Sequence, residues 1–133
     1  MEFRGSCLCK GIKFKILGDF ESFYLCHCRY CRKDTGSAHA ANLFSSTASI
    51  EWVRLRTEIR SYQPKRSSHV RAFCTHCGSA LPNLQAGGSL LVVPAGCLDT
   101  RLEKKPDAHI FVSHRASWDQ SLEKIMKYDA LPG

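Results

Sequence analysis

The segment Cys74-Thr75-His76-Cys77-Gly78 lies near the middle of the chain and has the form Cys-x-x-Cys-Gly. A tight turn of this length brings two sulfurs to one metal, and Gly78 can take the left-handed backbone conformation that closes the turn. Zinc in a structural site takes four ligands in a tetrahedron. The segment therefore predicts half of a zinc site.

The other half is found in Cys7-Leu8-Cys9 at the start of the chain. Side chains at positions i and i+2 of an extended segment point to the same side. Joined to Cys74 and Cys77, this pair would close a four-cysteine site and tie the start of the chain to its middle. The alternative is that these are redox or buried structural cysteines, but no βαβ pattern of the thioredoxin type surrounds Cys74.

A third cluster, Cys26-His27-Cys28-Arg29-Tyr30-Cys31, offers three sulfurs within six residues. Three protein ligands and one exchangeable position are typical of catalytic zinc. This site would instead be a second structural one if Cys97, His27 or His39 closed it. In an extended segment His27 points away from its neighbours. The remaining histidines, His69, His76, His109 and His114, are expected to be surface or packing residues.

The whole sequence of 133 residues is expected to form one domain, residues 1–133, because no repeat or linker divides it. It shows no signal peptide, and its longest apolar run, Leu90–Ala95, is far too short to span a bilayer. We therefore expect a cytoplasmic protein that does not contact membranes. Thiols stay reduced in that compartment, which favours metal binding over disulfides.

The formal net charge of +7 counts every cysteine as neutral. Seven thiolates and two Zn²⁺ ions change it by −7 and +4, which leaves about +4. A mildly basic surface suits a small anionic substrate and predicts at most weak binding to nucleic acid. The sequence also lacks the common hydrolase, phosphate-binding and dinucleotide motifs, so any chemistry is expected to belong to the metal.

Strand patterns dominate the chain, and they predict a mainly β fold. The expected strands begin with the alternating segment Ile12–Leu17 and continue with Ser22–Leu25, Ala40–Phe44, Ile50–Leu55, Ile59–Tyr62, His69–Phe73, Ser89–Val93 and His109–Val112. Two helices are expected. One is a short turn over Cys28–Asp34 that ends at Gly36, and the other spans Ser117–Lys127 with Ser117 as its N-cap.

These motifs together resemble the glutathione-dependent formaldehyde-activating enzyme family, which includes the vertebrate centromere protein V. The resemblance covers nearly the whole chain, from Gly5 to Trp118. It is carried by Gly5-x-Cys7-x-Cys9, by Cys26-His27-Cys28-x-x-Cys31-Arg32-Lys33-x-Thr35-Gly36, by Phe73-Cys74-x-x-Cys77-Gly78-Ser79, and by the later segments Gly96-x-Leu98-Asp99, His109–Val112 and Ala116-x-Trp118.

The resemblance implies a β-tent fold, in which small antiparallel sheets surround zinc sites. It also implies a structural zinc on Cys7, Cys9, Cys74 and Cys77, and a catalytic zinc on Cys26, Cys28 and Cys31. The activity it implies is that of a carbon–sulfur lyase, which joins glutathione to formaldehyde as S-hydroxymethylglutathione. Two positions depart from the family: Lys10 replaces a usual Gly, and Cys97 replaces a usual Ser or Thr.

The leading hypothesis is therefore a zinc enzyme that acts on a small anionic thiol or its aldehyde adduct, with Arg32 and Lys33 contacting the anionic ends. The rival hypothesis is a non-catalytic binding module that needs zinc only to fold. It would bind nucleic acid or protein through a basic strip made of Arg54, Arg56, Arg60, Lys65, Arg66 and Arg71.

Overall fold

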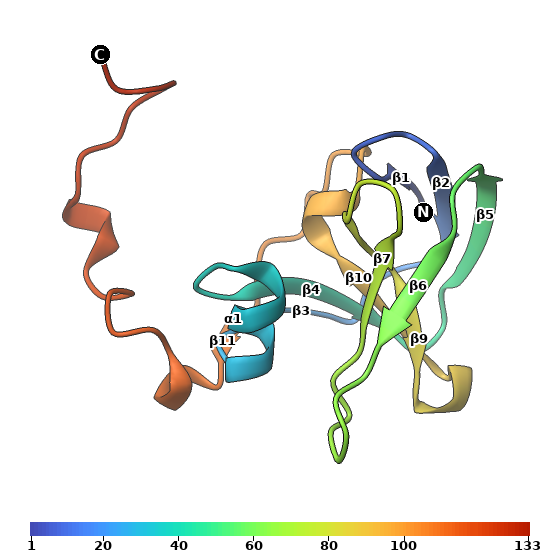
Figure 1. Cartoon of the computed structure of the whole chain (residues 1–133), viewed down its shortest axis with the longest axis horizontal. Coiled ribbons are helices and arrows are strands. Elements are labelled where there is room, and N and C mark those ends of the chain that lie inside the picture. Colours follow the sequence, from blue (N-terminus) through green and yellow to red (C-terminus); the bar gives the residue numbers. More distant parts are fainter.

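The computed structural model describes residues 1–133, which form three small β-sheets and one short α-helix (Figure 1). The first sheet has the order β1-β2-β5, with bounds β1 Glu2–Ser6, β2 Ile12–Leu17 and β5 Ser49–Leu55. The second has the order β11-β3-β4-β10-β9, with bounds β11 Ala108–Ile110, β3 Ser22–Cys26, β4 Ala40–Ser45, β10 Leu90–Pro94 and β9 Asn83–Gln85. The third has the order β6-β7-β8, with bounds β6 Ile59–Tyr62, β7 Arg71–Cys74 and β8 Ala80–Leu81.

The expected mainly β fold of small antiparallel sheets is confirmed. Every strand pair is antiparallel except β11 with β3, which is parallel and pairs Ile110 with Cys26. The α-helix α1 spans Arg29–Thr35, and four 3₁₀ turns complete the chain: η1 Ala86–Gly88, η2 Ala95–Cys97, η3 Val112–His114 and η4 Leu122–Lys124. None of these helices has the length and apolar character needed to cross a membrane.

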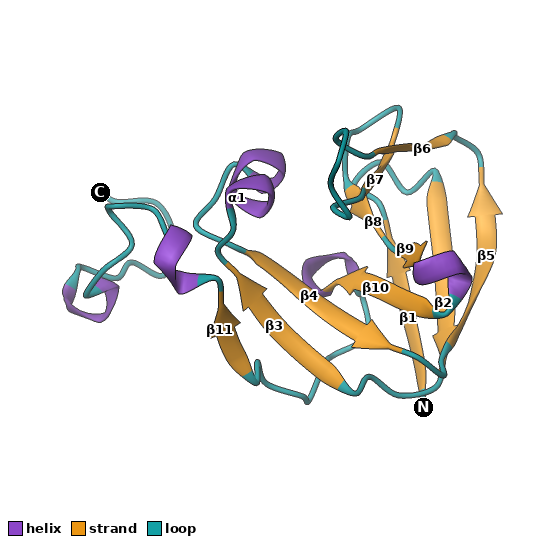
Figure 2. Cartoon of the chain, turned by 90° about the horizontal axis from the view of Figure 1, so that it is seen from below, coloured by secondary structure: helices purple, strands orange, loops and turns teal.

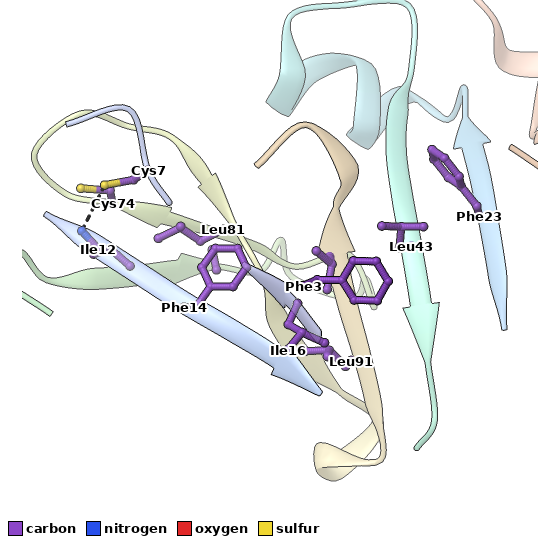
Figure 3. Packing of buried hydrophobic residues seen from close by; sticks show 12 residues of the cluster. Phe3, Cys7, Ile12, Phe14, Ile16, Phe23, Leu43, Cys74, Leu81 and Leu91 are labelled. Atoms are coloured by element: carbon purple, nitrogen blue, oxygen red, sulfur yellow. Dashed lines mark hydrogen bonds between the residues drawn. The ribbon is translucent and has the colours of Figure 1, made fainter. Parts of the chain in front are cut away.

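The core lies between the sheets and is built on the alternation seen in β2. Ile12, Phe14 and Ile16 are almost fully buried, while Lys13 and Lys15 between them are partly exposed. This is the pattern of a strand with one face on a core. Cys7 and Cys74 belong to the same buried cluster and lie at one end of it beside Ile12 (Figure 3). One cysteine cluster is therefore continuous with the hydrophobic core.

Helix α1 lies one residue later than the predicted span Cys28–Asp34, and it ends at Gly36 as expected. Cys28 is the N-cap, with its sulfur accepting a hydrogen bond from the backbone N–H of Cys31. Gly36 is the C-cap and has the left-handed conformation, with φ of 66°, which a glycine adopts without strain. The helix stands beside the ends of β3 and β4 (Figure 2), so it carries Cys28 and Cys31 close to Cys26 at the end of β3.

The predicted helix over Ser117–Lys127 is wrong. Only η4 forms there, and Ser121 before it has a left-handed φ of 55°, which interrupts any longer helix. The side chains expected to form its apolar face find no surface to pack on, since Ile125 and Met126 are 60% and 75% exposed. A helix of this length is marginal without such packing. The segment after β11 instead extends away from the sheets (Figure 1).

Candidate metal centres

The first centre joins two turns that are distant in sequence, one between β1 and β2 and the other between β7 and β8. The sulfurs of Cys7, Cys9, Cys74 and Cys77 all lie within 4.8 Å of one another. The sulfur of Cys9 is 3.5 Å from that of Cys7 and 3.9 Å from that of Cys74. Zinc–sulfur distances of about 2.3 Å in a tetrahedron place the sulfurs roughly 3.8 Å apart, so this donor set fits a zinc ion.

Local hydrogen bonds hold the two turns in shape. Gly78 has a φ of 77° and donates its N–H to the carbonyl of Cys74 at 2.8 Å, as expected for a turn closed by glycine. The N–H of Ile12 donates to the sulfur of Cys7 at 3.3 Å. Lys10, which departs from the family at a usual glycine, has a left-handed φ of 64°. The Cys-x-Cys turn therefore needs the glycine-like conformation even though a lysine occupies the position.

Two thiols of this group have pKa values shifted in opposite directions. Burial raises the pKa of Cys77, but hydrogen bonds with the side chain and backbone of Ser79 outweigh burial, and the pKa falls to about 5. The backbone N–H of Gly11 lowers the pKa of Cys9, yet burial and the neighbouring sulfurs raise it to about 11. Four adjacent thiolates repel one another strongly without a cation among them. A dication is what allows all four to ionise together.

The second centre contains three sulfurs from one short segment. Cys26 ends β3, Cys28 caps α1, and Cys31 lies in the first turn of that helix. Their sulfurs lie within 4.8 Å of one another, and none is in a disulfide. Burial raises the pKa of both Cys26 and Cys31. Burial also raises the pKa of Cys28, but the N–H of Cys31 and other local bonds lower it overall.

A cavity of about 470 Å³ opens onto this second centre, and its lining includes all three cysteines. Helix α1 contributes Tyr30 and Asp34, and the segment before and within β7 contributes His69 and Arg71. A volume of this size suits a small-molecule ligand. The three-sulfur cluster is therefore accessible from a cavity, whereas Cys7 and Cys74 of the first centre are buried in the core.

Neither histidine considered as a fourth ligand joins the three sulfurs. His27 is only 3% exposed and turns toward other imidazoles, with its Nε2 at 2.8 Å from Nδ1 of His109. Its Nδ1 lies 3.1 Å from a carboxylate oxygen of Asp119, without the alignment of a hydrogen bond. His39 lines the cavity, and burial, followed by the charges of His27 and His109, lowers its pKa.

Cys97 also lies apart from both sulfur groups. It belongs to η2, and burial raises the pKa of its thiol to about 12. A thiol with such a pKa stays protonated and behaves as a small apolar side chain.

Arg32 and Lys33, expected to contact an anionic substrate, lie outside the lining of the cavity. Tyr30, Cys31, Asp34 and Thr35 share the face of α1 that lines it, as positions three and four apart on a helix do, and residues 32 and 33 point elsewhere. The guanidinium that lines the cavity is that of Arg71. Two arginines of the basic strip form ion pairs. Nη1 of Arg71 lies 3.6 Å from Oδ1 of Asp34, and Nη2 of Arg60 lies 3.7 Å from Oε2 of Glu58.

Three charged or titratable residues of the cavity wall had no assigned role in the sequence prediction of the site: Asp34, His69 and Arg71. Asp34 carried a usable signal, because it follows Cys31 by three positions on a predicted helix and so shares its face. His69 and Arg71 carried none, since only their contacts with distant side chains of α1 bring them to this cavity.

The fold and the site define a mainly β, cysteine-rich protein. It has small sheets, one short helix and two cysteine clusters that could hold metal ions. The chain belongs to the glutathione-dependent formaldehyde-activating enzyme family, whose model matches residues 2–114. The match includes all seven clustered cysteines and ends at residue 114, shortly after β11. A comparison with curated proteins gave no match.

Among solved structures, the chain is similar to a Rhodobacter sphaeroides protein determined by crystallography. The two share 20% sequence identity, with a TM-score of 0.57. The similarity covers 80% of this chain and 98% of the other. At this identity it supports the fold alone.

Proposed function

We propose that the protein is a zinc-dependent carbon–sulfur lyase that acts on a small thiol and its formaldehyde adduct, of the kind represented by glutathione and S-hydroxymethylglutathione. The observation that carries the proposal is the placement of three free, clustered sulfurs on the wall of a cavity of about 470 Å³. Membership of the formaldehyde-activating family supports the choice of thiol and aldehyde. The reducing conditions of the cytoplasm would keep the cysteines available.

In this proposal the chain holds two zinc ions with different roles. Cys7, Cys9, Cys74 and Cys77 would hold the structural ion, because their donor set is complete and half of it lies in the core. Cys26, Cys28 and Cys31 would hold the second ion and leave one position for a ligand. Zinc bound there supplies positive charge that favours the thiolate form of an incoming thiol.

The remaining chemistry is simple addition. The thiol loses its proton, its sulfur bonds to the formaldehyde carbon, and the former carbonyl oxygen takes a proton. The reverse sequence is the lyase reaction. The cavity offers a mixed lining for such a substrate, with Arg71 for a carboxylate, Asn42 and Gln85 for amide groups, and Phe44 and Phe111 as apolar walls.

The test uses zinc-loaded protein and measures how fast formaldehyde exchanges between the free pool and its glutathione adduct, by two-dimensional exchange NMR. We expect faster exchange than without protein. Cobalt-substituted protein gives a second readout, since adding thiol should change the absorption of one metal and leave the other unchanged. No acceleration and no spectral change would mean that both centres are closed. A gel shift at physiological salt would then test the rival binding module, whose nucleic-acid contacts are salt-sensitive.

A further inference from the structure

A carboxylate–imidazole pair lies on the wall of the cavity and joins α1, which carries Cys31, to the loop before β7. The Nε2 atom of His69, in the loop before β7, is hydrogen-bonded to the carboxylate of Asp34 on α1. The two side chains are about equally shielded, with 18% and 20% of their surface exposed. Both line the same cavity as Cys28 and Cys31. Neither residue has a role in holding metal.

Several contacts fix the position of His69. Its ring stacks on that of Tyr30, with centroids 5.5 Å apart and an interplanar angle of 19°. Its backbone N–H donates to the hydroxyl of Ser67 at 3.0 Å. Asp34 is held in turn by Arg71, whose Nη1 lies 3.6 Å from its other oxygen. An imidazole clamped on one face and at one nitrogen is preorganised for proton transfer.

The hydrogen bond also sets the tautomer. A carboxylate accepts, so the Nε2 of His69 carries the proton, and Nδ1 of the neutral ring holds a lone pair. Nδ1 has no hydrogen-bond partner in the protein and is not fully buried. The charged and titratable groups that face His69 are Asp34 and Tyr30 on α1 and Arg71 on β7. The ring is therefore a base with a free lone pair on a substrate-sized cavity.

We propose that His69 is the proton-transfer residue for thiol–aldehyde chemistry in this cavity, with Asp34 as its positioning residue. This inference rests on the proposed function. The S–H proton of the thiol passes to Nδ1 of His69, and the sulfur electron pair forms the bond to the formaldehyde carbon. The π electrons of the carbonyl move to its oxygen, which then takes the proton back from Nδ1. No oxidant, reductant or further reactant is needed.

His39 is the other imidazole on the cavity wall, and it is less suited to this role. No carboxylate is hydrogen-bonded to its ring, and burial followed by the neighbouring charges of His27 and His109 lowers its pKa. His39 lies against His27 with ring centroids 5.1 Å apart and so belongs to the separate imidazole cluster.

The test compares His69→Gln with His114→Gln, an exposed histidine outside the cavity lining. Glutamine at position 69 can still donate a hydrogen bond to Asp34 but cannot accept a proton at neutral pH. We expect the exchange rate to fall about 10²-fold in His69→Gln, because a positioned acid–base residue contributes 10²-fold or more. Zinc content and the Kd for thiol, read from cobalt absorption, should stay unchanged. His114→Gln should match the wild type in all three.

A second variant, Asp34→Asn, separates positioning from structure. The amide of asparagine can donate as well as accept, so it no longer holds the proton of His69 on Nε2. The exchange rate should fall and the ring should populate both tautomers, which a merely structural role for Asp34 would not produce. Nitrogen chemical shifts of His69 in wild-type protein give a readout independent of activity, and we expect the tautomer with the proton on Nε2.

The outcomes are distinguishable. An active wild type with a His69→Gln rate within twofold of it overturns this inference and leaves the proposed function standing. Loss of zinc or of thiol binding in His69→Gln, or a neutral wild-type ring with its proton on Nδ1, also overturns it. A zinc-loaded wild type with no activity toward any thiol overturns the proposed function, and this inference with it.

Discussion

The sulfur of Cys9 lies 3.9 Å from that of Cys74, although 65 positions separate the two residues in the chain. This contact ties the turn that follows β1 to the end of β7 and so joins the first sheet to the third. Cys74 is fully buried within the main core. A metal held at this point would contribute directly to folding.

Replacement of Cys74 by serine should therefore remove one zinc and unfold the protein. Structural zinc sites supply folding free energy, and about 10 kcal/mol or more is common for small zinc domains. Metal analysis and circular dichroism of Cys74→Ser provide the measurement. Cys97→Ser is the matched control, since Cys97 lies in neither cluster, and it should keep both zinc ions and most of the stability. Folded wild-type protein without zinc would contradict the prediction.

The second centre should behave differently. Cys28→Ser should lose the other zinc and the activity but keep its fold, because the cluster lies within one short segment and cross-links nothing distant. Serine is itself a favoured N-cap, so helix α1 should survive the change. Metal content, the exchange rate and the melting temperature should be measured together. A collapse in stability comparable to that of Cys74→Ser would show that both centres are structural.

Gly5 should tolerate no side chain. A Cβ at this position would lie 2.2 Å from Cζ of Phe14 and 2.6 Å from the carbonyl oxygen of Cys97. Gly5→Ala forces the buried Phe14 ring to move, and overpacking of this kind costs about 1–3 kcal/mol. The control is Gly96→Ala, where nothing lies within 4 Å of the added atom. Denaturant unfolding of both variants checks the difference, and equal midpoints would refute it.

Lys10 holds a left-handed conformation that glycine adopts freely. Lys10→Gly should therefore be more stable than Lys10→Ala by about 1 kcal/mol, which is the penalty for a Cβ in this region. Comparing two variants that both lack the lysine side chain removes its contacts with Ser6 and Asp99 from the difference. Thermal unfolding of the zinc-loaded proteins is the measurement, and an advantage for alanine would be the opposite result.

Cys97 should resist alkylation in the folded protein. Burial raises the pKa of its thiol from 9.0 to about 12, so the thiolate fraction at pH 8 is lower by roughly 10³ than for an ordinary thiol. The labelling rate should increase as the pH rises toward that pKa. Iodoacetamide and mass spectrometry would measure it, with all eight cysteines reacting once the protein is unfolded and zinc is chelated. Rapid labelling of Cys97 at pH 8 in native protein would contradict the raised pKa of its thiol.

The cysteine clusters and most strands were predictable because short-range chemistry determines them. Spacing alone places Cys74 and Cys77 on one turn, and alternation alone places Ile12, Phe14 and Ile16 on one face. Gly36, which ends α1, was predictable for the same reason. In each case the physical cause lies within a few residues of its effect.

Features that depend on distant parts of the chain were not predictable in this way. The pairing of Asp34 with His69 spans 35 positions and requires the loop before β7 to lie beside α1. The parallel placement of β11 against β3 has no local signature. The expected C-terminal helix failed for the opposite reason, because a good local pattern met no surface to cover. A helical sequence pattern without tertiary packing was not sufficient to form a helix.

The different spans of the two centres have a consequence for how the protein is made. Translation delivers Cys26, Cys28 and Cys31 together, so the three-sulfur centre can form while the chain is still growing. Cys7 and Cys9 emerge earlier still, but their partners, Cys74 and Cys77, follow only after most of the third sheet has been synthesised. At 5–20 residues per second this delay is roughly 3 to 14 seconds. During that interval the first two thiols are open to oxidation or to capture of the wrong metal, and the nascent chain is most dependent on the zinc supply and reducing conditions around the ribosome.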